Sequence, residues 1–218
     1  MTDVETLLNI CKKDFVERQQ ALLGEIMSRN KKPLVLEDGT LVIPSKSERP
    51  VSLVAHYDNV SGSFGYNDNG MSIVAILGML DHLMENVEVV FTNGEECGST
   101  GAKKYLSQRI AKPLACVNLD VCGYGDTIYL DEMNSTFSTG VSAVRGAMPW
   151  NDGRMFERQG IPSVCVSTSY GNEFNKGIGL IWKTIHNQEL DNRVEVLNFD
   201  LLPRVRKVVD TLVQGALA

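Results

Sequence analysis

The pattern of apolar and polar positions predicts a chain in which strands and helices alternate. An amphipathic segment at 4–28 and a hairpin at 32–44 come first, and apolar β-rich runs then recur with helical patterns between them. Such alternation is typical of a largely parallel sheet covered on both faces. We therefore predict an α/β fold, a three-layer α/β/α sandwich with a mostly parallel mixed sheet. The expected strands are 51–56, 87–91, 114–120, 127–130 and 163–167, and the expected helices are 4–28, 71–84, 101–110, a region after 135, 155–159 and 202–214.

Length and composition narrow the class of protein. The 218 residues fit one domain, 1–218, which can bury a full core without disulfides, so a bound metal would be catalytic rather than structural. The net charge of −6 argues against nucleic acid or an anionic membrane as a partner. Five cysteines without framework spacing, an N-terminus unlike a signal peptide and no long apolar run predict a cytoplasmic protein without a membrane contact.

Polar residues follow three of the predicted strands at the point where each strand ends. His56, Glu95 and Asp120 all lie at or just past the carboxyl end of an apolar run. In open α/β sheets this edge is where ligand sites form. The adjacent carboxylates of Glu95 and Glu96 need a turn that aims them separately. In a hydrolytic metal site, Glu96 would hold a metal and Glu95 would take a proton from water as the general base.

Other polar residues near these strand ends have both an ordinary and a functional interpretation. Asp58 is close enough to His56 to hydrogen-bond its second imidazole nitrogen and support catalysis, although it could equally be a solvated strand-end residue. Asp68, in the turn-rich loop 65–70, could cap the following helix or bridge two metals, and its context favours the bridge. His186 is a further candidate ligand, whereas His82, at the end of a predicted helix, is expected at the surface.

The candidate ligands together form a nitrogen and oxygen donor set without thiolate. Such a set suits zinc, with cobalt or manganese as alternatives, and a bridging carboxylate would hold two metals per chain. The five predicted ligands are His56, Asp68, Glu96, Asp120 and His186.

Several stretches in order along the chain resemble the co-catalytic zinc peptidases that include aminopeptidase Y and bacterial leucyl aminopeptidase. The matching stretches are 55–58, 65–70, 93–98, 117–120, 151–156, 160–162 and 185–186. The resemblance implies that one zinc is bound by His56 and Asp120, the other by Glu96 and His186, and both by Asp68. It also implies that Glu95 is the base and that the Asp68–Asn69 peptide is cis.

The chain departs from the family pattern at several points. Asn151-Asp152-Gly153 replaces the frequent Ser-Asp-His, and Asn187 stands where threonine commonly follows the last histidine. Insertions that shape the substrate pocket of larger members are absent. These departures affect specificity more than metal binding.

The resemblance implies an aminopeptidase that removes N-terminal residues from a peptide or a small amino-acyl substrate. Tyr170, Phe174 and Trp182, in the loop 169–184, are predicted to line the pocket for the first side chain, although aromatic residues equally often fill cores. Asp152 is a further candidate for substrate contact.

Three alternatives stay open. One is a glutaminyl-peptide cyclotransferase-like acyltransferase with one zinc, for which Trp150 and Asp152 would be relevant. Another is a non-catalytic binding domain on the same scaffold. A carboxypeptidase or deacylase is the third, in which Arg154 would meet a substrate carboxylate, although Arg154 is rather expected to be a surface residue. A short peptidase has few loops with which to restrict its site, so a homo-oligomer is also an open expectation.

Overall fold

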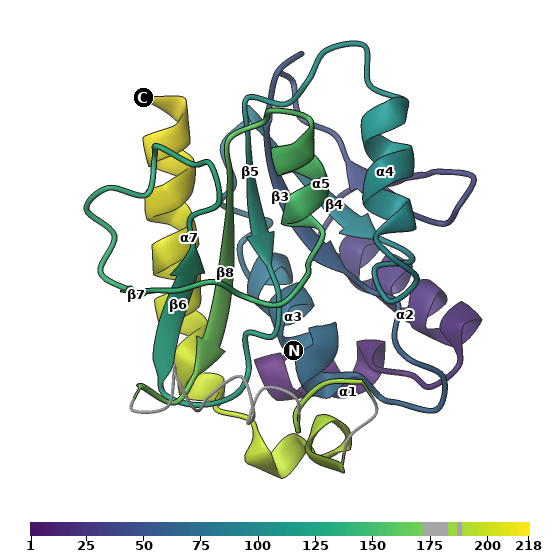
Figure 1. Cartoon of the computed structure of the whole chain (residues 1–218). Helices are drawn as coiled ribbons and strands as arrows, with labels where there is room; N and C mark the ends of the chain where they lie inside the picture. The colour runs from purple at the N-terminus through teal and green to yellow at the C-terminus, as the bar shows by residue number, and fades with distance from the viewer. Residues whose placement is uncertain (172–182, 187–188) are drawn as a thin grey trace.

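The computed structural model describes residues 1–171, 183–186 and 189–218, and within them helices cover both faces of a mixed sheet (Figure 1). The described strands form one sheet in the order β1-β2-β4-β3-β5-β8-β6-β7. Their bounds are β1 Leu34–Val35, β2 Leu41–Ile43, β3 Val51–His56, β4 Val87–Thr92, β5 Ala115–Leu119, β6 Thr127–Asp131, β7 Val144–Arg145 and β8 Ser163–Ser169. The α-helices are α1 Asp3–Ile10, α2 Phe15–Ser28, α3 Met71–Leu77, α4 Thr100–Ser107, α5 Gly153–Arg158 and α7 Leu202–Leu217. The predicted three-layer sandwich is confirmed.

The centre of the sheet is parallel. Strand β3 pairs in parallel with both β4 and β5, and β5 pairs in parallel with β8, whereas β2 and β6 join this core in antiparallel orientation. His56 at the end of β3 pairs in register with Thr92 at the end of β4. The loops that follow these strands therefore leave the sheet side by side at one edge.

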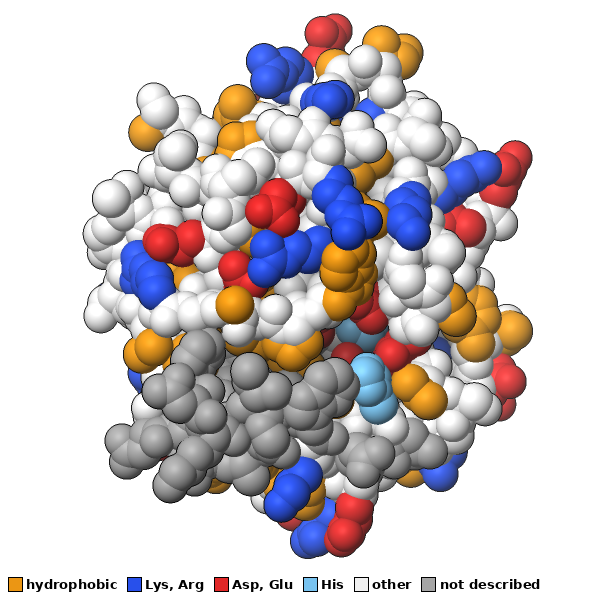
Figure 2. Space-filling model, in the orientation of Figure 1, with side chains coloured by type: hydrophobic (Ala, Val, Ile, Leu, Met, Phe, Trp, Pro, Cys, Tyr) orange, Lys and Arg blue, Asp and Glu red, His pale blue; other side chains and the backbone are white. Residues whose placement is uncertain are grey.

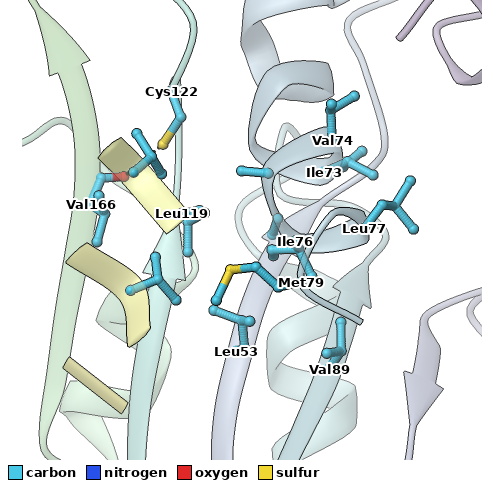
Figure 3. Packing of buried hydrophobic residues seen from close by; sticks show 14 of the residues in the cluster. Leu53, Ile73, Val74, Ile76, Leu77, Met79, Val89, Leu119, Cys122 and Val166 are labelled. Atoms are coloured by element: carbon cyan, nitrogen blue, oxygen red, sulfur yellow. Dashed lines mark hydrogen bonds between the residues drawn. The ribbon is translucent and has the colours of Figure 1, made fainter. Parts of the chain in front are cut away.

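Neighbouring residues of the central strands point to opposite faces of the sheet, and helices bury both faces. Leu53 belongs to the larger core cluster, with residues of α1, α2, α3 and α7, whereas Val54 belongs to a smaller cluster with residues of α4 and α5. Figure 3 shows Leu53 beside Ile76 and Met79 on the first of these faces. Each such side chain contributes about 1.5–3 kcal/mol by leaving water.

The N-terminal segment differs from the prediction of one helix at 4–28. It forms two helices, α1 and α2, because Asp14 starts a new helix by accepting a hydrogen bond from the backbone of Glu17 at 3.0 Å. Helix α3 ends at Leu77, well before the predicted end at 84. In its last turn the carbonyl oxygens of Val74 and Ala75 accept hydrogen bonds from Arg206 of α7.

The region after 135 was expected to be helical, and this prediction is wrong. It is an irregular loop with the short strand β7. The guanidinium of Arg145 donates to the carbonyl oxygens of Val141, Ala143 and Ser138 at 2.7–2.9 Å. Three carbonyl groups of the loop are thus satisfied by a side chain instead of by helical hydrogen bonds. The other predicted strands and helices are found with ends shifted by up to three residues.

Within the described residues, no helix combines the length and apolar character needed to cross a bilayer.

Candidate metal centre and active site

The candidate ligands gather at the carboxyl edge of the parallel strands. His56 ends β3, Asp120 follows β5, and the pair Glu95–Glu96 lies in the turn after β4. Asp68 lies in the short π-helical turn Tyr66–Gly70 that leads into α3. Figure 2 shows this face, where histidine and acidic side chains are visible in a hollow. The strand ends therefore bring together residues separated by more than sixty positions in the sequence.

Two groups of potential ligand atoms share Asp68. In the first, Nε2 of His56 lies 3.1 Å from Oδ1 of Asp68 and 3.6 Å from Oδ1 of Asp120. In the second, Nε2 of His186 lies 3.5 Å from Oε2 of Glu96. The backbone N–H of His186 also donates to Oδ2 of Asp68 at 3.3 Å. Within each group the ligand atoms lie within 4.8 Å of one another.

The spacing of these atoms fits zinc. Zinc binds nitrogen and oxygen ligands at about 2.0–2.2 Å in a tetrahedron, whose corners are then about 3.3–3.6 Å apart. The separations of 3.6 Å from His56 to Asp120 and 3.5 Å from His186 to Glu96 lie in this range, and the 3.1 Å from His56 to Asp68 is slightly shorter. The donor set contains no thiolate, because no cysteine of the described residues belongs to either group. The residues present therefore fit two zinc ions that share Asp68.

The charges of the site also favour a cation. Burial, followed by repulsion from neighbouring carboxylates, raises the pKa of Glu95 to about 9 and that of Glu96 to about 8. Burial raises the pKa of Asp120 as well, against a hydrogen bond from His56. Burial alone would lower the pKa of His56, but hydrogen bonds to Asp120, Asp58 and Asp68 hold it well above its usual range. Divalent cations would offset this excess of negative charge.

Asp58 connects the first histidine to the glutamate turn. Its two carboxylate oxygens accept hydrogen bonds from the backbone N–H groups of Glu95 and Glu96, each at 3.1 Å. One of these oxygens also lies 3.5 Å from Nδ1 of His56. Burial opposes ionisation of Asp58, but the hydrogen bonds from His56 and the two backbone groups hold its pKa below the usual value. Asp58 thus fixes both the imidazole and the turn.

The loop that carries Asp68 is attached to the end of β5 through Asn69. The peptide bond between Asp68 and Asn69 is cis, as the resemblance implies. The side chain of Asn69 donates to the carbonyl of Leu119 at 2.9 Å and accepts from the N–H of Val121 at 3.1 Å. These two contacts tie the Asp68 loop to the end of β5, where Asp120 lies.

Asp191 is a site residue that the sequence analysis missed. Its side chain is 1% exposed, and its Oδ1 accepts from the backbone N–H groups of Asn67 at 3.1 Å and Asp68 at 3.0 Å. Its Oδ2 accepts from the hydroxyl of Ser63 at 2.7 Å. The only local signal is its place five residues after His186, in the same polar stretch. The contacts themselves join segments that no short pattern connects.

A cavity of about 250 Å³ opens over the metal centre. Acidic residues of the two ligand groups and Glu95 line it. Its lining also includes the apolar residues Val121, Met148, Pro149, Trp150 and Ile185.

The predicted substrate residues do not line this cavity where they can be located. Tyr170 lies outside the lining and packs edge-on against Tyr124, with ring centroids 5.2 Å apart. Asp152 is buried, and one of its oxygens accepts from the hydroxyl of Thr92. Phe174 and Trp182 lie outside the described residues. Contact of these four side chains with substrate therefore stays a prediction.

The family model described as peptidase family M28 matches residues 40–176, more than half of the chain. The chain belongs to peptidase family M28. This M28 protein is accordingly a hydrolase of the zinc metallopeptidase class, as the resemblance implies.

Curated relatives match a limited part of the M28 protein. The vacuolar membrane protease of Colletotrichum graminicola is 39% identical over 79 residues, which cover 33% of this chain and 8% of that protein. The vacuolar membrane protease of Clavispora lusitaniae is 36% identical over 89 residues, covering 37% of this chain and 9% of the relative. Because these relatives are named as membrane proteases, the predicted cytoplasmic location and lack of a membrane partner are not confirmed.

Solved structures share the fold of the M28 protein over most of its length. The LapA aminopeptidase of Legionella pneumophila has a TM-score of 0.75 at 14% identity, over 98% of this chain and 70% of that one. The zinc aminopeptidase BSAP of Bacillus subtilis has a TM-score of 0.65 at 21% identity, over 81% and 49%. A glutaminyl cyclase of Bacteroides thetaiotaomicron has a TM-score of 0.71 at 14% identity, over 97% of both chains. At these identities the likeness concerns the fold.

Proposed function

We propose that this M28 protein is a two-zinc aminopeptidase, which removes N-terminal residues from peptides, and that residues 1–218 form its single catalytic domain. The observation that supports the proposal most strongly is the sharing of Asp68 between two ligand groups, each with its own histidine. A site of this kind accommodates two metal ions, and Glu95 lies beside it in the same cavity.

The two ligand groups support one assignment of the zinc ligands. His56 and Asp120 would hold one zinc, Glu96 and His186 the other, and Asp68 both. Zinc bound there would supply a Lewis acid that polarises the scissile carbonyl and lowers the pKa of the attacking water.

Glu95 performs the proton transfer in this proposal. It lines the cavity and belongs to neither ligand group, so its carboxylate is available to the water and the substrate. It accepts a proton from the water as the oxygen attacks the carbonyl carbon, and it delivers that proton to the leaving amine nitrogen as the carbon–nitrogen bond breaks. The backbone hydrogen bond from Glu95 to Asp58 orients the turn that carries this carboxylate.

The cavity suits the free amino group of a peptide. The N-terminal ammonium carries a positive charge, and the carboxylate of Glu95, which belongs to neither ligand group, lines the cavity that it would enter. The apolar residues that line the same cavity would receive the first side chain.

A glutaminyl cyclase is the second candidate, because the Bacteroides thetaiotaomicron cyclase matches 97% of both chains. A cyclase would release ammonia from an N-terminal glutamine by attack of its own α-amino group, with no water consumed. Hydrolysis of leucine 4-nitroanilide, compared with pyroglutamate formation from a glutaminyl peptide, distinguishes the two candidates.

The decisive variant for the proposed mechanism is Glu95→Gln. It removes the proton acceptor and keeps the side-chain shape, so turnover of leucine 4-nitroanilide should fall by about 10²–10⁴-fold. Zinc content by elemental analysis should stay at two per chain. Glu85→Gln is the matched control, because Glu85 is exposed and pairs only with Lys46. Wild-type turnover by Glu95→Gln would refute the assigned base, and fewer than two zinc ions would refute the shared site.

A further inference from the structure

A stacked tryptophan and arginine stand at the rim of the cavity. Trp150 lines the cavity with 47% of its surface exposed, and its indole N–H donates to the hydroxyl of the buried Ser99 at 3.1 Å. The guanidinium of Arg158, from α5, lies 4.4 Å from the centroid of the Trp150 ring. The indole is thus held in one orientation and carries a positive charge on its face.

A second cation lies at a neighbouring point of the rim. The ammonium of Lys103, from α4, donates to the carbonyl oxygen of Gly98 at 2.8 Å, and Gly98 lines the same cavity. Lys103 and Arg158 also both line a groove between α4 and α5. The two charges are therefore close to each other and to the opening of the cavity. Figure 2 shows Lys and Arg side chains gathered beside the hollow that contains the acidic residues.

These two cations differ from nearby ones in lacking an acidic partner. Lys104, the next residue of α4, pairs with Glu37 at 2.9 Å, and Arg154 of α5 pairs with Asp131 at 2.5 Å. Among the described residues, neither Lys103 nor Arg158 forms an ion pair with a carboxylate. Two unneutralised cations at the mouth of an acidic cavity are available for an anionic group of a ligand.

We infer that Arg158 and Lys103 bind a carboxylate on the leaving side of the substrate, so that the enzyme prefers di- and tripeptides to longer or amidated substrates. This inference rests on the proposed aminopeptidase function. A peptide bound with its ammonium near Glu95 would extend its following residues toward the opening of the cavity. Successive residues of an extended peptide are about 3.5 Å apart, so only in a short peptide does the terminal carboxylate stay close to the cleaved bond.

Charge favours the same orientation. Cations at the rim favour a carboxylate over a neutral amide at that end of the substrate. Arginine offers a planar fork that matches a carboxylate, and its stacking on Trp150 keeps the fork in place. Such an arrangement selects short peptides, because only in them is the terminal carboxylate near the cleaved bond.

The test compares three substrates of the zinc-loaded enzyme: leucyl-leucine, leucyl-leucine amide and leucyl-glutamate α-amide, whose free carboxylate is on its side chain. We expect kcat/KM for leucyl-leucine to exceed that for its amide by about tenfold, which corresponds to about 1.4 kcal/mol. The α-amide of leucyl-glutamate shows whether a side-chain carboxylate serves as well as the terminal one. The preference should weaken as salt is added.

The variants Arg158→Gln and Lys103→Gln should each raise KM for leucyl-leucine and lower the ratio of acid to amide. Their combination should bring this ratio close to one. Lys104→Gln is the matched control, since Lys104 lies on the same helix but is paired with Glu37, and it should keep the wild-type ratio. Calorimetric binding of both substrates to Glu95→Gln measures recognition without turnover.

Each result has a distinct meaning. Equal kcat/KM for acid and amide in the wild type, or a preference that survives in the double variant, overturns the inference but leaves the aminopeptidase proposal standing. A preference that is lost in both rim variants and kept in Lys104→Gln supports it. If the wild type cleaves none of these substrates and Glu95→Gln binds none of them, the proposed function fails and the inference fails with it.

Discussion

Replacing Asp191 by asparagine tests whether this buried carboxylate positions the shared ligand. Asp191 accepts hydrogen bonds from the backbone of Asn67 and Asp68 and from the hydroxyl of Ser63. Asparagine has nearly the same shape and keeps one oxygen for the two backbone groups. Its amide nitrogen, however, would face the Ser63 hydroxyl, and the substitution removes the negative charge. We therefore expect a looser Asp68 with little change in the fold.

The expected magnitudes differ between stability and metal binding. Hydrogen bonds to a charged acceptor contribute about 1.5–3 kcal/mol, against about 1 kcal/mol for a neutral one. Burial and then repulsion from Asp68 raise the pKa of Asp191 to about 7, so loss of this charge also relieves an unfavourable contact. The net loss of stability should be about 1 kcal/mol. Removal of a group that orients a metal ligand typically weakens metal affinity 10–100-fold, which is about 1.4–2.7 kcal/mol.

The assay measures zinc affinity by competition with a chelating dye and the stability of the metal-free protein by urea unfolding. Asp81→Asn is the control, because Asp81 is exposed and remote from the ligand groups. Asp191→Ala should cost the metal-free protein more, about 3–5 kcal/mol, since three buried donors lose their acceptor. Wild-type zinc affinity in Asp191→Asn would refute the positioning role, whatever happens to stability.

Further predictions concern the metal, the glutamate turn and the loop before Asp68. When free zinc is present at about 100 times the Kd of a site, its removal by a chelator should lower the midpoint of thermal unfolding by about 5–10 °C for each site. Calorimetry measures this midpoint, and an unchanged value would contradict zinc binding to the folded state. Gly101→Ala would place a Cβ against the backbone of Asn93, so it should destabilise the protein by about 1–3 kcal/mol and lower turnover, whereas Gly24→Ala, with open space around it, should be neutral or stabilising. Arg18, which is 1% exposed, donates to three carbonyl oxygens in the loop 57–65, so Arg18→Met should cost about 3 kcal/mol in urea unfolding, and a loss below 1 kcal/mol would contradict this role.

The sheet and most of the candidate ligands could be predicted because their signals are local. An apolar β-rich run followed by a histidine or carboxylate identifies both a strand and the edge at which it ends, and parallel pairing brings such edges together. His56 and Asp120 are examples, since each ends a strand of the parallel core and they lie 3.6 Å apart. The pairing of terminal carboxylates with histidines came only from the family resemblance.

The loop after 135 could not be predicted, because nothing in its sequence pattern shows that Arg145 donates to three carbonyl oxygens of this loop. The break between α1 and α2 did carry a local signal, because Asp14 precedes Glu17 by three residues, as a capping residue does. The continuous apolar spacing across the break concealed it.

The residues that position the ligands, here called supports, all act through backbone groups of other segments. This explains why the sequence predicted the ligands more readily than the supports. Asp58, Asn69 and Asp191 act through backbone groups of other segments, namely N–H groups of the glutamate turn, the end of β5 and the Asp68 loop. A ligand needs a particular side chain at a strand end, and that choice is visible in the sequence. A support needs only an acceptor or donor that the fold brings within about 3 Å of a backbone group. Because the supports act on loops that would otherwise be mobile, their loss should affect metal affinity before it affects the fold.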